Sequence, residues 1–405
     1  MNAILSIPLP LRLAALFAVG ALVGGFVNWG TYRLAWHQRL ISPWSAPPEG
    51  APRRKWTDRI PIVGWLRMSR QWQAHGRGFW IRPMSVEIAT GVFFALLYVY
   101  ETQWSGRIVL QLGAPPPAEF LSTHLALVEQ VRYLSHLLII SLMLVASLID
   151  VDEKTIPDSI TVPGAIVGLA LAAIYPWSLL PADPWPAQGG AGVEFLTLAS
   201  PGLWPQVLDG LPHRAGLAAG LGCWTLWCVG LMPRRWNTRR GWAVATRVFW
   251  RRLRAESMTY GMLGVWFVGG AAIVLAASQA KPAHWAGLLT ALVGLAAGGG
   301  LVWVVRVVGA AALRREAMGF GDVTLMSMIG AFVGWQPALI VFFLAPFAGL
   351  AIGVLQWVMH REHEVPYGPF LCLAALFVIV DWTTIWQRVS QYFDMGWMLP
   401  AILAV

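Results

Sequence analysis

Two aspartates in this chain stand where apolar sequence meets polar sequence, a setting in which a carboxylic acid can do chemistry. Asp322 closes the glycine-punctuated stretch Glu316–Asp322, and Asp150 closes an apolar run and opens the polar stretch Asp150–Asp158. Hydrocarbon cannot solvate a carboxylate, so an acid at the mouth of a membrane helix costs free energy. If both acids lie on one membrane face, they form the pair found at aspartic-protease sites, where like charges at close range cannot both ionise.

Such a pair supplies both of the roles that peptide hydrolysis needs. The protonated member hydrogen-bonds the carbonyl of the scissile bond as general acid, and the ionised member takes a proton from the attacking water. No metal or other cofactor is needed for this reaction. Gly319 and Gly321 lack side chains and leave space for another backbone to approach. Close helix packing is the alternative explanation for these two glycines.

The four aspartates of the two stretches also have structural explanations. Spans commonly end in charges, so Asp150 taken alone is more simply a boundary charge, and Asp322 heads a helix that it is placed to cap. Asp152 lies two residues beyond Asp150 and points to another face of a continuing helix, which indicates a structural or tuning role. Asp158 follows Pro157 and precedes an apolar run, which is typical of an N-cap. We keep Asp152 and Asp158 as supporting residues of the site.

Two further acids, Glu87 and Asp381, lie at the edges of apolar runs. Pairing with a basic loop residue, or helix capping, explains both of them better than catalysis does. Glu87 opens the second span and is kept as a third supporting residue.

No pattern of metal ligands stands out in the sequence. The three cysteines, Cys223, Cys228 and Cys372, lie inside apolar runs and form no CxxC pair, which argues against a zinc knuckle and a disulfide framework. Cys223 and Cys228 are expected to pack as small apolar side chains. The closely spaced histidines His360 and His363 lie in a polar loop, so we expect no metal site.

The composition is that of a membrane protein. Of the 405 residues, 57% are hydrophobic and 12% are charged. Apolar runs of about 17 to 25 residues recur, and this length is enough to cross the ~30 Å hydrocarbon core as a helix. The sequence therefore predicts an all-α polytopic fold with about nine to ten transmembrane helices. The first run, residues 10–31, precedes no cleavage site and is interpreted as a retained span rather than a signal peptide.

The expected spans are 10–31, 84–100, 133–149, 159–179, 214–232, 259–277, 284–309, 337–358 and 369–386, with a shorter apolar run directly after Asp322. At 1.5 Å per residue this shorter run covers only about 18 to 20 Å. Either the bilayer thins there or Asp322 lies below the membrane surface. The tail 387–405 is amphipathic and is too short to be assigned as a span.

Basic residues are concentrated in two loops, and this sets the orientation in the membrane. Residues 33–82 hold ten Lys or Arg against two acids, and residues 233–258 hold eight arginines against one acid. Both loops are therefore expected in the cytoplasm. Four spans separate Asp150 from Asp322, an even number, so both acids emerge on the cytoplasmic side. The same loops account for the net charge of +9, and nucleic-acid binding, which needs an exposed basic face, is not expected.

The residues around the two acids resemble the signature segments of the type IV prepilin peptidases, which are membrane aspartic endopeptidases of the Gly-x-Gly-Asp class. These two segments are Asp150–Ser159 and Met318–Leu325. The resemblance extends to five more segments, namely Gly24–Leu34, Ile60–Leu66, Pro83–Glu87, Gly330–Gln336 and Val365–Phe370. Together they cover both ends and the centre of the chain, in the order and topology of the family.

The resemblance implies a catalytic pair, Asp150 and Asp322, and a loop, Gly319 with Gly321, that admits the substrate backbone. The implied substrates are prepilins and pseudopilins of type IV pili or type II secretion. Their short basic leader is cut on the cytoplasmic side after a glycine, just before an apolar helix. The protein is then expected to be a hydrolase of the bacterial inner membrane, in contact with the lipid bilayer, whose proteolysis needs no cofactor.

Two features depart from the family pattern. Many bacterial members carry two CxxC pairs in the first cytoplasmic loop, linked with zinc and with methylation of the new N-terminus. Residues 33–82 contain no cysteine, which argues against zinc and leaves methylation, and with it S-adenosylmethionine, conditional. The two aspartates are also 172 positions apart, so residues 181–283 are interpreted as an inserted helix pair. The chain then divides into N-terminal spans with a basic loop, 1–100, and a peptidase membrane domain, 131–405.

Two other functions fit parts of the pattern. One is a catalytically idle membrane subunit of a pilus or secretion assembly, with the insertion as an interaction module. The other is an acid-dependent transporter, which the position of the acids at span ends rather than mid-span disfavours. The sequence does not specify which prepilins are cut, what the insertion binds, or the oligomeric state.

Overall fold

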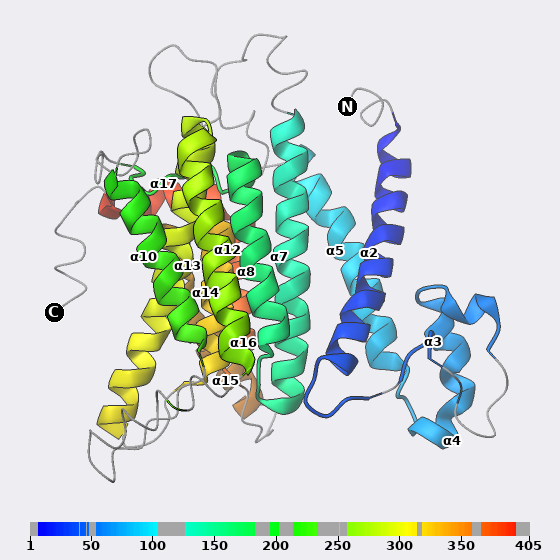
Figure 1. The fold of residues 1–405 in the computed structure, drawn as a ribbon. Helices are drawn as coiled ribbons and strands as arrows, with labels where there is room; N and C mark the ends of the chain where they lie inside the picture. Colours follow the sequence, from blue (N-terminus) through cyan, green and yellow to red (C-terminus); the bar gives the residue numbers. More distant parts are fainter. Residues whose placement is uncertain are drawn as a thin grey trace.

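The structure is a computed structural model, and it describes residues 7–39, 41–45, 47, 54–103, 126–182, 195–201, 214–232, 251, 257–313, 318–358 and 366–393. The helices in these ranges are α2 (Leu9–Arg33), α3 (Val63–Met68), α4 (Trp72–His75), α5 (Ile81–Gln103), α7 (Ala126–Glu153), α8 (Asp158–Ile174), α10 (Arg214–Leu231), α12 (Ser257–Gln279), α13 (Pro282–Leu313), α14 (Phe320–Val333), α15 (Trp335–Val358), α16 (Gly368–Val380) and α17 (Trp382–Phe393). No strand occurs in these ranges, and the expected all-α membrane architecture is confirmed (Figure 1).

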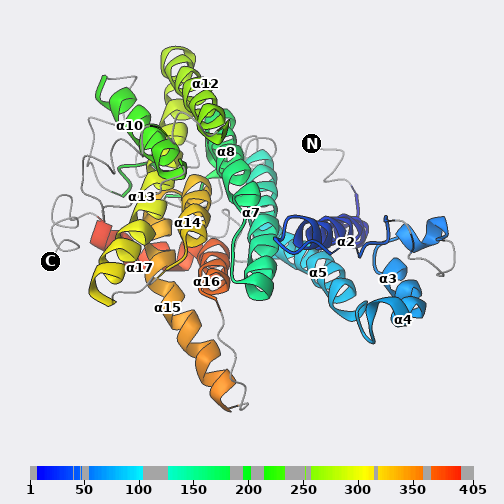
Figure 2. The same ribbon diagram turned by 60° about the horizontal axis from the view of Figure 1, so that its bottom comes forward.

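The long helices form two groups that meet at α7. Helices α2 and α5 make a pair, with the short helices α3 and α4 at one end, and the remaining helices form a bundle (Figure 2). Helix α7 contacts α2 and α5 on one side and α8, α14 and α16 on the other. It is therefore the element through which the N-terminal pair is joined to the bundle.

Glycines set the close contact between α2 and α5. A Cβ atom on Gly20 would lie 2.8 Å from Cα of Gly91, and a Cβ atom on Gly24 would lie 2.6 Å from Cα of Glu87. No side chain fits at either position, so the two backbones touch. Small residues allow this kind of close approach between membrane helices.

Glu87 ties the segment before α5 to the helix pair. Its buried carboxylate accepts hydrogen bonds from the backbone N–H of Ile62 and from Trp65 Nε1, the latter at 2.7 Å, and Asn28 Nδ2 lies 3.5 Å from it. The basic partner or capping role expected for Glu87 is therefore wrong: neutral donors from α2 and from the region of α3 surround it. Because a buried carboxylate needs hydrogen bonds to be stable, these contacts hold Ile60–Leu66 in place.

Helix α14 lies at the centre of the bundle. Every residue from Asp322 to Val333 is buried, packed against α8, α13, α15 and α16. Gly294 of α13 and Gly330 of α14 face each other so closely that a Cβ atom on either would collide with the backbone of the other. Apolar residues on all sides of α14 thus indicate a helix in the core of the bundle rather than a helix that faces lipid.

The run Gly298–Gly300 of α13 packs closely at two of its three positions. A Cβ atom on Gly298 would collide with the carbonyl oxygen of Met326, and one on Gly299 would collide with Ser327 Oγ. A Cβ atom on Gly300 would meet nothing within 4 Å. Gly300 therefore faces open space beside α14.

Six of the described helices are long and apolar enough to cross a membrane, namely α2, α5, α7, α12, α13 and α15. Helices α8 and α14 are shorter apolar helices, with 17 and 14 residues. The nine to ten spans expected from the sequence include these two, α10 and the last apolar run.

The last span is placed wrongly by the sequence. Instead of one helix over residues 369–386, α16 ends at Val380 and α17 follows at an angle of 93°. Asp381 stands at the C-cap position at this break, where its backbone N–H donates to the carbonyl of Phe377 at 2.9 Å, and the role expected for its carboxylate stays a prediction. Trp382 and Trp386 of α17 are buried and stacked, with ring centroids 5.0 Å apart, and Trp382 Nε1 donates to the carbonyl of Pro181 at 2.7 Å. Helix α17 therefore lies across the end of the bundle (Figure 1).

Residues 195–201 close the end of the bundle that lies opposite the two aspartates. Gln336 Nε2 donates to the carbonyl of Thr197 at 2.8 Å, and Trp335 Nε1 donates to that of Leu198 at 3.0 Å. Several features discussed from the sequence lie outside the described residues: Glu316 and Ala317, His360 and His363, most of the arginine-rich loop 233–258 and the tail from residue 394.

Helices α10 and α12 pack on each other and, through α10, on α13. Gly269 of α12 leaves room for the indole of Trp224, whose Nε1 donates to the carbonyl of Trp266 at 3.0 Å. The interpretation of residues 181–283 as an insertion stays a prediction, as does the division of the chain into 1–100 and 131–405.

Candidate active site

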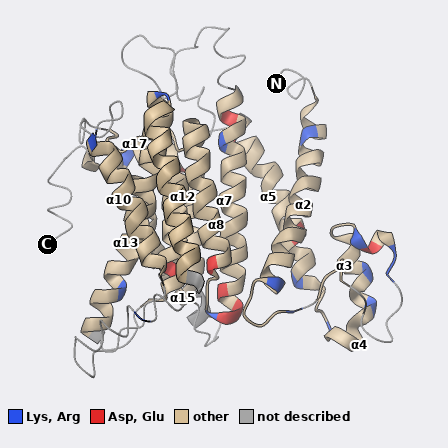
Figure 3. Ribbon diagram, in the orientation of Figure 1, with Lys and Arg blue, Asp and Glu red and all other residues tan. Residues whose placement is uncertain are grey.

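Asp150 and Asp322 lie at the same end of the bundle. Asp150 is in the last turn of α7 and Asp322 is in the first turn of α14, and the two residues are only 4% and 7% exposed. Acidic residues gather at this end of α7 and α8 (Figure 3). The placement agrees with the even number of spans expected between the two aspartates.

The start of α16 holds Asp150. Gly368, the first residue of α16, donates its backbone N–H to Asp150 Oδ2 at 3.1 Å. A Cβ atom on Gly368 would collide with this same oxygen and would lie 2.8 Å from Ile156 Cδ1. Only glycine therefore allows the start of α16 to come this close to the carboxyl group.

The glycine loop holds Asp322. Gly319 is the N-cap residue of α14, and its N–H donates to Asp322 Oδ2 at 3.2 Å. The carboxyl group thus reaches back to the N-cap as in a capping box, which confirms the capping role considered for Asp322. This role leaves room for chemistry, because within the part of the chain that the structure describes both aspartates use only Oδ2 in hydrogen bonds.

Ile156 packs between the two segments that hold the acids. It contacts Gly368, as described above, and a Cβ atom on Gly321 would lie 2.8 Å from Ile156 Cβ. Across this contact the charge of Asp322 acts on the carboxyl group of Asp150. The space beside Gly321 is thus filled by the chain itself, whereas a Cβ atom on Gly319 would meet nothing closer than 3.5 Å.

Tyr367 precedes α16 and lies beside the same acids. Burial, and in second place the charge of Asp322, raises the pKa of the Tyr367 hydroxyl to about 12. The hydroxyl group therefore stays protonated at neutral pH and can donate a hydrogen bond at the site.

Asp152 has the structural role that its position predicts. Its carboxylate oxygens accept hydrogen bonds from Arg82 Nη1 at 2.7 and 2.9 Å, and Arg39 Nη1 lies 3.9 Å away. The ion pair with Arg82 joins the end of α7 to the start of α5. Glu87, the other supporting residue on α5, is occupied by the contacts described above.

The N-cap role predicted for Asp158 is wrong. The N-cap of α8 is Pro157, and Asp158 is the first residue of the helix itself, with no side-chain hydrogen bond at the cap. Its carboxylate instead lies beside the hydroxyl group of Thr324 of α14, two residues beyond Asp322. Asp158 therefore links the polar stretch that follows Asp150 to the helix that carries the second aspartate.

Arg306 of α13 positions the glycine loop from the other side, a role that the sequence analysis missed. Its Nε donates to the carbonyl of Met318 at 3.1 Å, and its guanidinium carbon lies 5.7 Å from the centroid of the Phe320 ring. Both contacts fall on residues just before Asp322. The signal in the sequence is a lone arginine within an apolar span, which the cost of a charge in hydrocarbon makes unusual.

For the aspartic endopeptidase that the sequence predicts, replacing Arg306 with alanine is expected to lower kcat by about tenfold to hundredfold and to leave KM nearly unchanged, because a misplaced catalytic group reacts slowly. Arg306→Lys should recover only part of the loss, since an ammonium group lacks the planar guanidinium that stacks on an aromatic ring. The matched control is Arg77→Ala, whose guanidinium stacks over Trp72 away from the acids. Steady-state kinetics of the three variants in one lipid mixture test this; a normal kcat for Arg306→Ala would contradict it.

The sequence matches two family models that fit this geometry. One, described as the type IV leader peptidase family, matches residues 137–232 and 258–354 and so includes Asp150, Asp322 and the elements around them. The other, described as the bacterial peptidase A24 N-terminal domain, matches residues 18–100. The chain belongs to the type IV leader peptidase family. The resemblance seen in the signature segments is confirmed, and the family's N-terminal unit corresponds to α2, α3, α4 and α5.

The individual relatives in this family match only part of this chain. The chain is 30% identical over 164 residues to a protein of Myxococcus xanthus named prepilin leader peptidase/N-methyltransferase, covering 40% of this chain and 41% of that protein. It is 27% identical over 139 residues to a protein of the same name from Aeromonas hydrophila, covering 31% and 48%. The chain thus spans less than half the length of these relatives. No solved structure matches it.

The described residues hold no group of three or more His, Cys, Asp or Glu side chains that could bind a metal ion. Cys228 and Cys372 are buried and Cys223 is half-buried, and all three thiols are free. They pack among apolar side chains, as the sequence predicts for Cys223 and Cys228.

Proposed function

We propose that this protein is a membrane aspartic endopeptidase that removes the short basic leader of type IV prepilins or pseudopilins at the cytoplasmic face of the bacterial inner membrane. The observation that carries the proposal is the pair of buried carboxyl groups, Asp150 and Asp322, held at one end of the bundle by Gly368 and Gly319. Membership of the type IV leader peptidase family and the names of the relatives support it.

The proposed mechanism uses the two aspartates as acid and base. Two close carboxyl groups cannot both ionise, so one is protonated and hydrogen-bonds the carbonyl oxygen of the scissile bond. The ionised partner takes a proton from a water molecule, whose oxygen attacks the carbonyl carbon. The tetrahedral intermediate breaks when the leaving amine nitrogen is protonated. The Oδ1 atoms of Asp150 and Asp322 are suited to this exchange because the Oδ2 atoms accept backbone hydrogen bonds.

The substrate backbone is proposed to approach along Gly319, where a Cβ atom would meet only Asp322 and the next residues of the loop. Ile156 takes the space beside Gly321, so in our proposal this second glycine shapes the loop rather than touching the substrate. The many basic residues near this membrane face do not attract a basic leader. Anionic lipid headgroups, and Asp158 near the pair, offset part of this repulsion.

The alternative is a catalytically idle membrane subunit of a pilus or secretion assembly. It predicts no constraint on the two carboxyl groups, whereas each of them accepts a backbone N–H, and the N–H at Asp150 belongs to Gly368, a position that only glycine permits. Transport is disfavoured because both acids lie at helix ends. The peptidase is therefore the function that the geometry supports best.

The test is cleavage of a type IV prepilin by the purified full chain in liposomes that contain anionic lipid. The expected product is the mature pilin without its leader, identified by the mass of its N-terminal peptide. A parallel sample with S-adenosylmethionine decides whether the new N-terminus also gains a methyl group. If the Myxococcus xanthus relative cuts the same prepilin and this chain does not, the proposal is wrong.

A further inference from the structure

A short segment with apolar side chains is held beside the start of α5. It consists of the 3-10 helix η1 (Trp56–Arg59) and α3, which packs on η1 and on α5 (Figure 1). Glu87 of α5 accepts the indole N–H of Trp65 and the backbone N–H of Ile62, so α3 is fixed at the level of this residue. Because α5 begins at Ile81, Glu87 lies only about 9 Å along the helix. Helix α5 is long and apolar enough to cross a membrane, and α3 therefore lies near the edge of the bilayer.

Helix α3 is apolar on both of its sides. The side that faces the protein is buried and consists of Gly64, Trp65 and Met68. The outward side of α3, together with the residue that precedes Pro61, carries three apolar side chains that are 39% to 53% exposed, namely Ile60, Val63 and Leu66. Contacts with the protein thus explain only the buried side. Exposed apolar side chains are stabilised when they leave water, so the outward side of α3 fits a lipid environment.

Exposed arginines stand before and after this outward side, and Lys and Arg residues gather around α3 and α4 (Figure 3). The guanidinium carbon of Arg59 lies 5.5 Å from the ring centroid of Trp44, and Arg70 Nε donates to the carbonyl of Arg67 at 3.0 Å. Arg67 forms an ion pair with Asp58 at 3.1 Å. Within the part of the chain that the structure describes, neither Arg59 nor Arg70 has an acidic partner. Their charges are therefore available to an anion.

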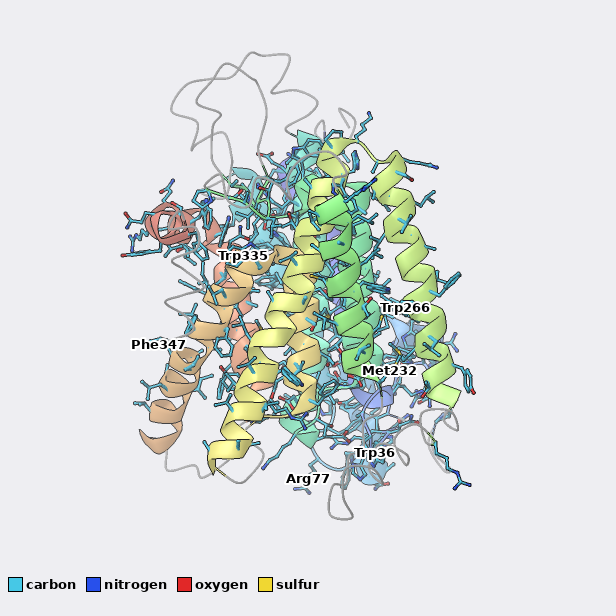
Figure 4. All side chains as sticks on the ribbon, turned by 60° about the vertical axis from the view of Figure 1, so that its left-hand side comes forward. Trp36, Arg77, Met232, Trp266, Trp335 and Phe347 are labelled. Atoms are coloured by element: carbon cyan, nitrogen blue, oxygen red, sulfur yellow. The ribbon has the colours of Figure 1, made fainter. Side chains whose placement is uncertain are left out.

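Exposed tryptophans belong to the same region. Trp56 of η1 is 76% exposed, and Trp72 of α4 is exposed with the guanidinium carbon of Arg77 5.6 Å from its ring centroid. Trp36, which follows α2, is 87% exposed. Figure 4 shows Trp36 and Arg77 at one end of the molecule, with Trp335 toward the other end. Tryptophan is enriched where membrane meets water, because its ring is apolar and its N–H is polar.

We propose that η1 and α3 form an interfacial anchor that binds anionic phospholipid headgroups. The outward side of α3 enters the boundary between headgroups and acyl chains, and Arg59 and Arg70 contact lipid phosphate. The occupant is lipid because α3 is fixed beside a membrane helix at the depth, about 5 to 10 Å, to which interfacial helices bury their apolar side. Charge agrees with this, since residues 33–82 hold ten Lys or Arg against two acids and an anionic leaflet attracts such a segment. The inference does not depend on the proposed function.

The first test measures the depth of the outward side of α3 in a bilayer. A nitroxide is attached at Leu66→Cys in the full chain, with the three native cysteines changed to alanine, in liposomes of phosphatidylcholine and phosphatidylglycerol. Collision rates with oxygen and with a water-soluble nickel chelate should place it at the headgroups or up to about 10 Å below them. A nitroxide at Leu22, which is exposed in the middle of α2, is the reference for the bilayer centre. If the nickel chelate reaches Leu66 as freely as in water, the inference is wrong and this side is left to a protein partner.

The second test asks whether the headgroup must be anionic. Phosphatidylglycerol with a photoactivatable headgroup should crosslink to residues 56–72 of the unmodified full chain, as read by mass spectrometry of its peptides. In Arg59→Gln/Arg70→Gln the yield should fall by about fivefold or more, the factor that one basic residue contributes near an anionic surface. The matched control is Arg214→Gln/Arg388→Gln, which removes two exposed arginines from α10 and α17 and should leave the yield unchanged. Equal yields from phosphatidylglycerol and from an equivalent phosphatidylcholine, or an equal loss in both double variants, would overturn the proposal.

Discussion

Changing either Asp150 or Asp322 to asparagine is expected to lower the rate of prepilin cleavage by about 10²- to 10⁴-fold, the contribution of a positioned acid or base. An asparagine has the shape of the aspartate, and its side-chain oxygen can still accept the N–H of Gly368 or Gly319. It cannot give or take the proton that the reaction needs. The fold should therefore survive while the chemistry is lost, and cleavage of a prepilin by the purified variants measures the loss.

Asp152→Asn is the control for this pair. Asp152 lies two residues from Asp150 but forms a partly exposed ion pair with Arg82, and such pairs contribute only about 0–1 kcal/mol. Its cleavage rate should change by less than about tenfold. If Asp150→Asn or Asp322→Asn cuts at the rate of the unmodified protein, the assignment of the pair is wrong. If Asp152→Asn loses as much activity as they do, the site includes Asp152.

The second large effect is expected from Gly368→Ala, which should lower kcat by about 10²-fold or more because it displaces the carboxyl group of Asp150, which we propose as catalytic. The added methyl group would collide with Asp150 Oδ2 and press on Ile156, so the start of α16 must move away. The backbone N–H that holds Asp150 then moves with it. Steady-state kinetics in liposomes measure the change.

Gly353→Ala is the matched control for this prediction, since a methyl group there meets nothing within 4 Å. Gly353→Ala should cut the prepilin at the normal rate. The amount of folded Gly368→Ala in the membrane separates a local effect on Asp150 from a loss of the fold. A well-folded Gly368→Ala variant with full activity would show that the contact between α16 and Asp150 has no part in catalysis.

Much of the fold could be predicted from the sequence because it depends on local properties. Helix length follows from the length of each apolar run, and α2, α5, α7 and α13 each cover the run that predicts them. Loop charge and an even number of spans place Asp150 and Asp322 at one end without any knowledge of packing. The capping role of Asp322 follows from its position at the head of an apolar helix.

The parts that could not be predicted depend on contacts between distant segments. Gly368 and Asp150 are 218 positions apart, and no periodicity relates them. Only the folded bundle places Ile156 between Gly321 and Gly368. The bend between α16 and α17 depends on packing of Trp382 and Trp386 against the end of the bundle, which outweighs the continuous apolar run.

The length of α16 has a consequence for the surrounding lipid. This helix has 13 residues and is about 20 Å long, its side chains Leu373 and Phe377 are exposed, and its first residue, Gly368, holds Asp150. The hydrocarbon core of a bilayer is about 30 Å thick. Such hydrophobic mismatch is relieved by local thinning of the bilayer, at a cost that rises with acyl-chain length. Bilayer thickness therefore becomes a variable of the reaction, because it sets how readily water and the leader reach the two acids.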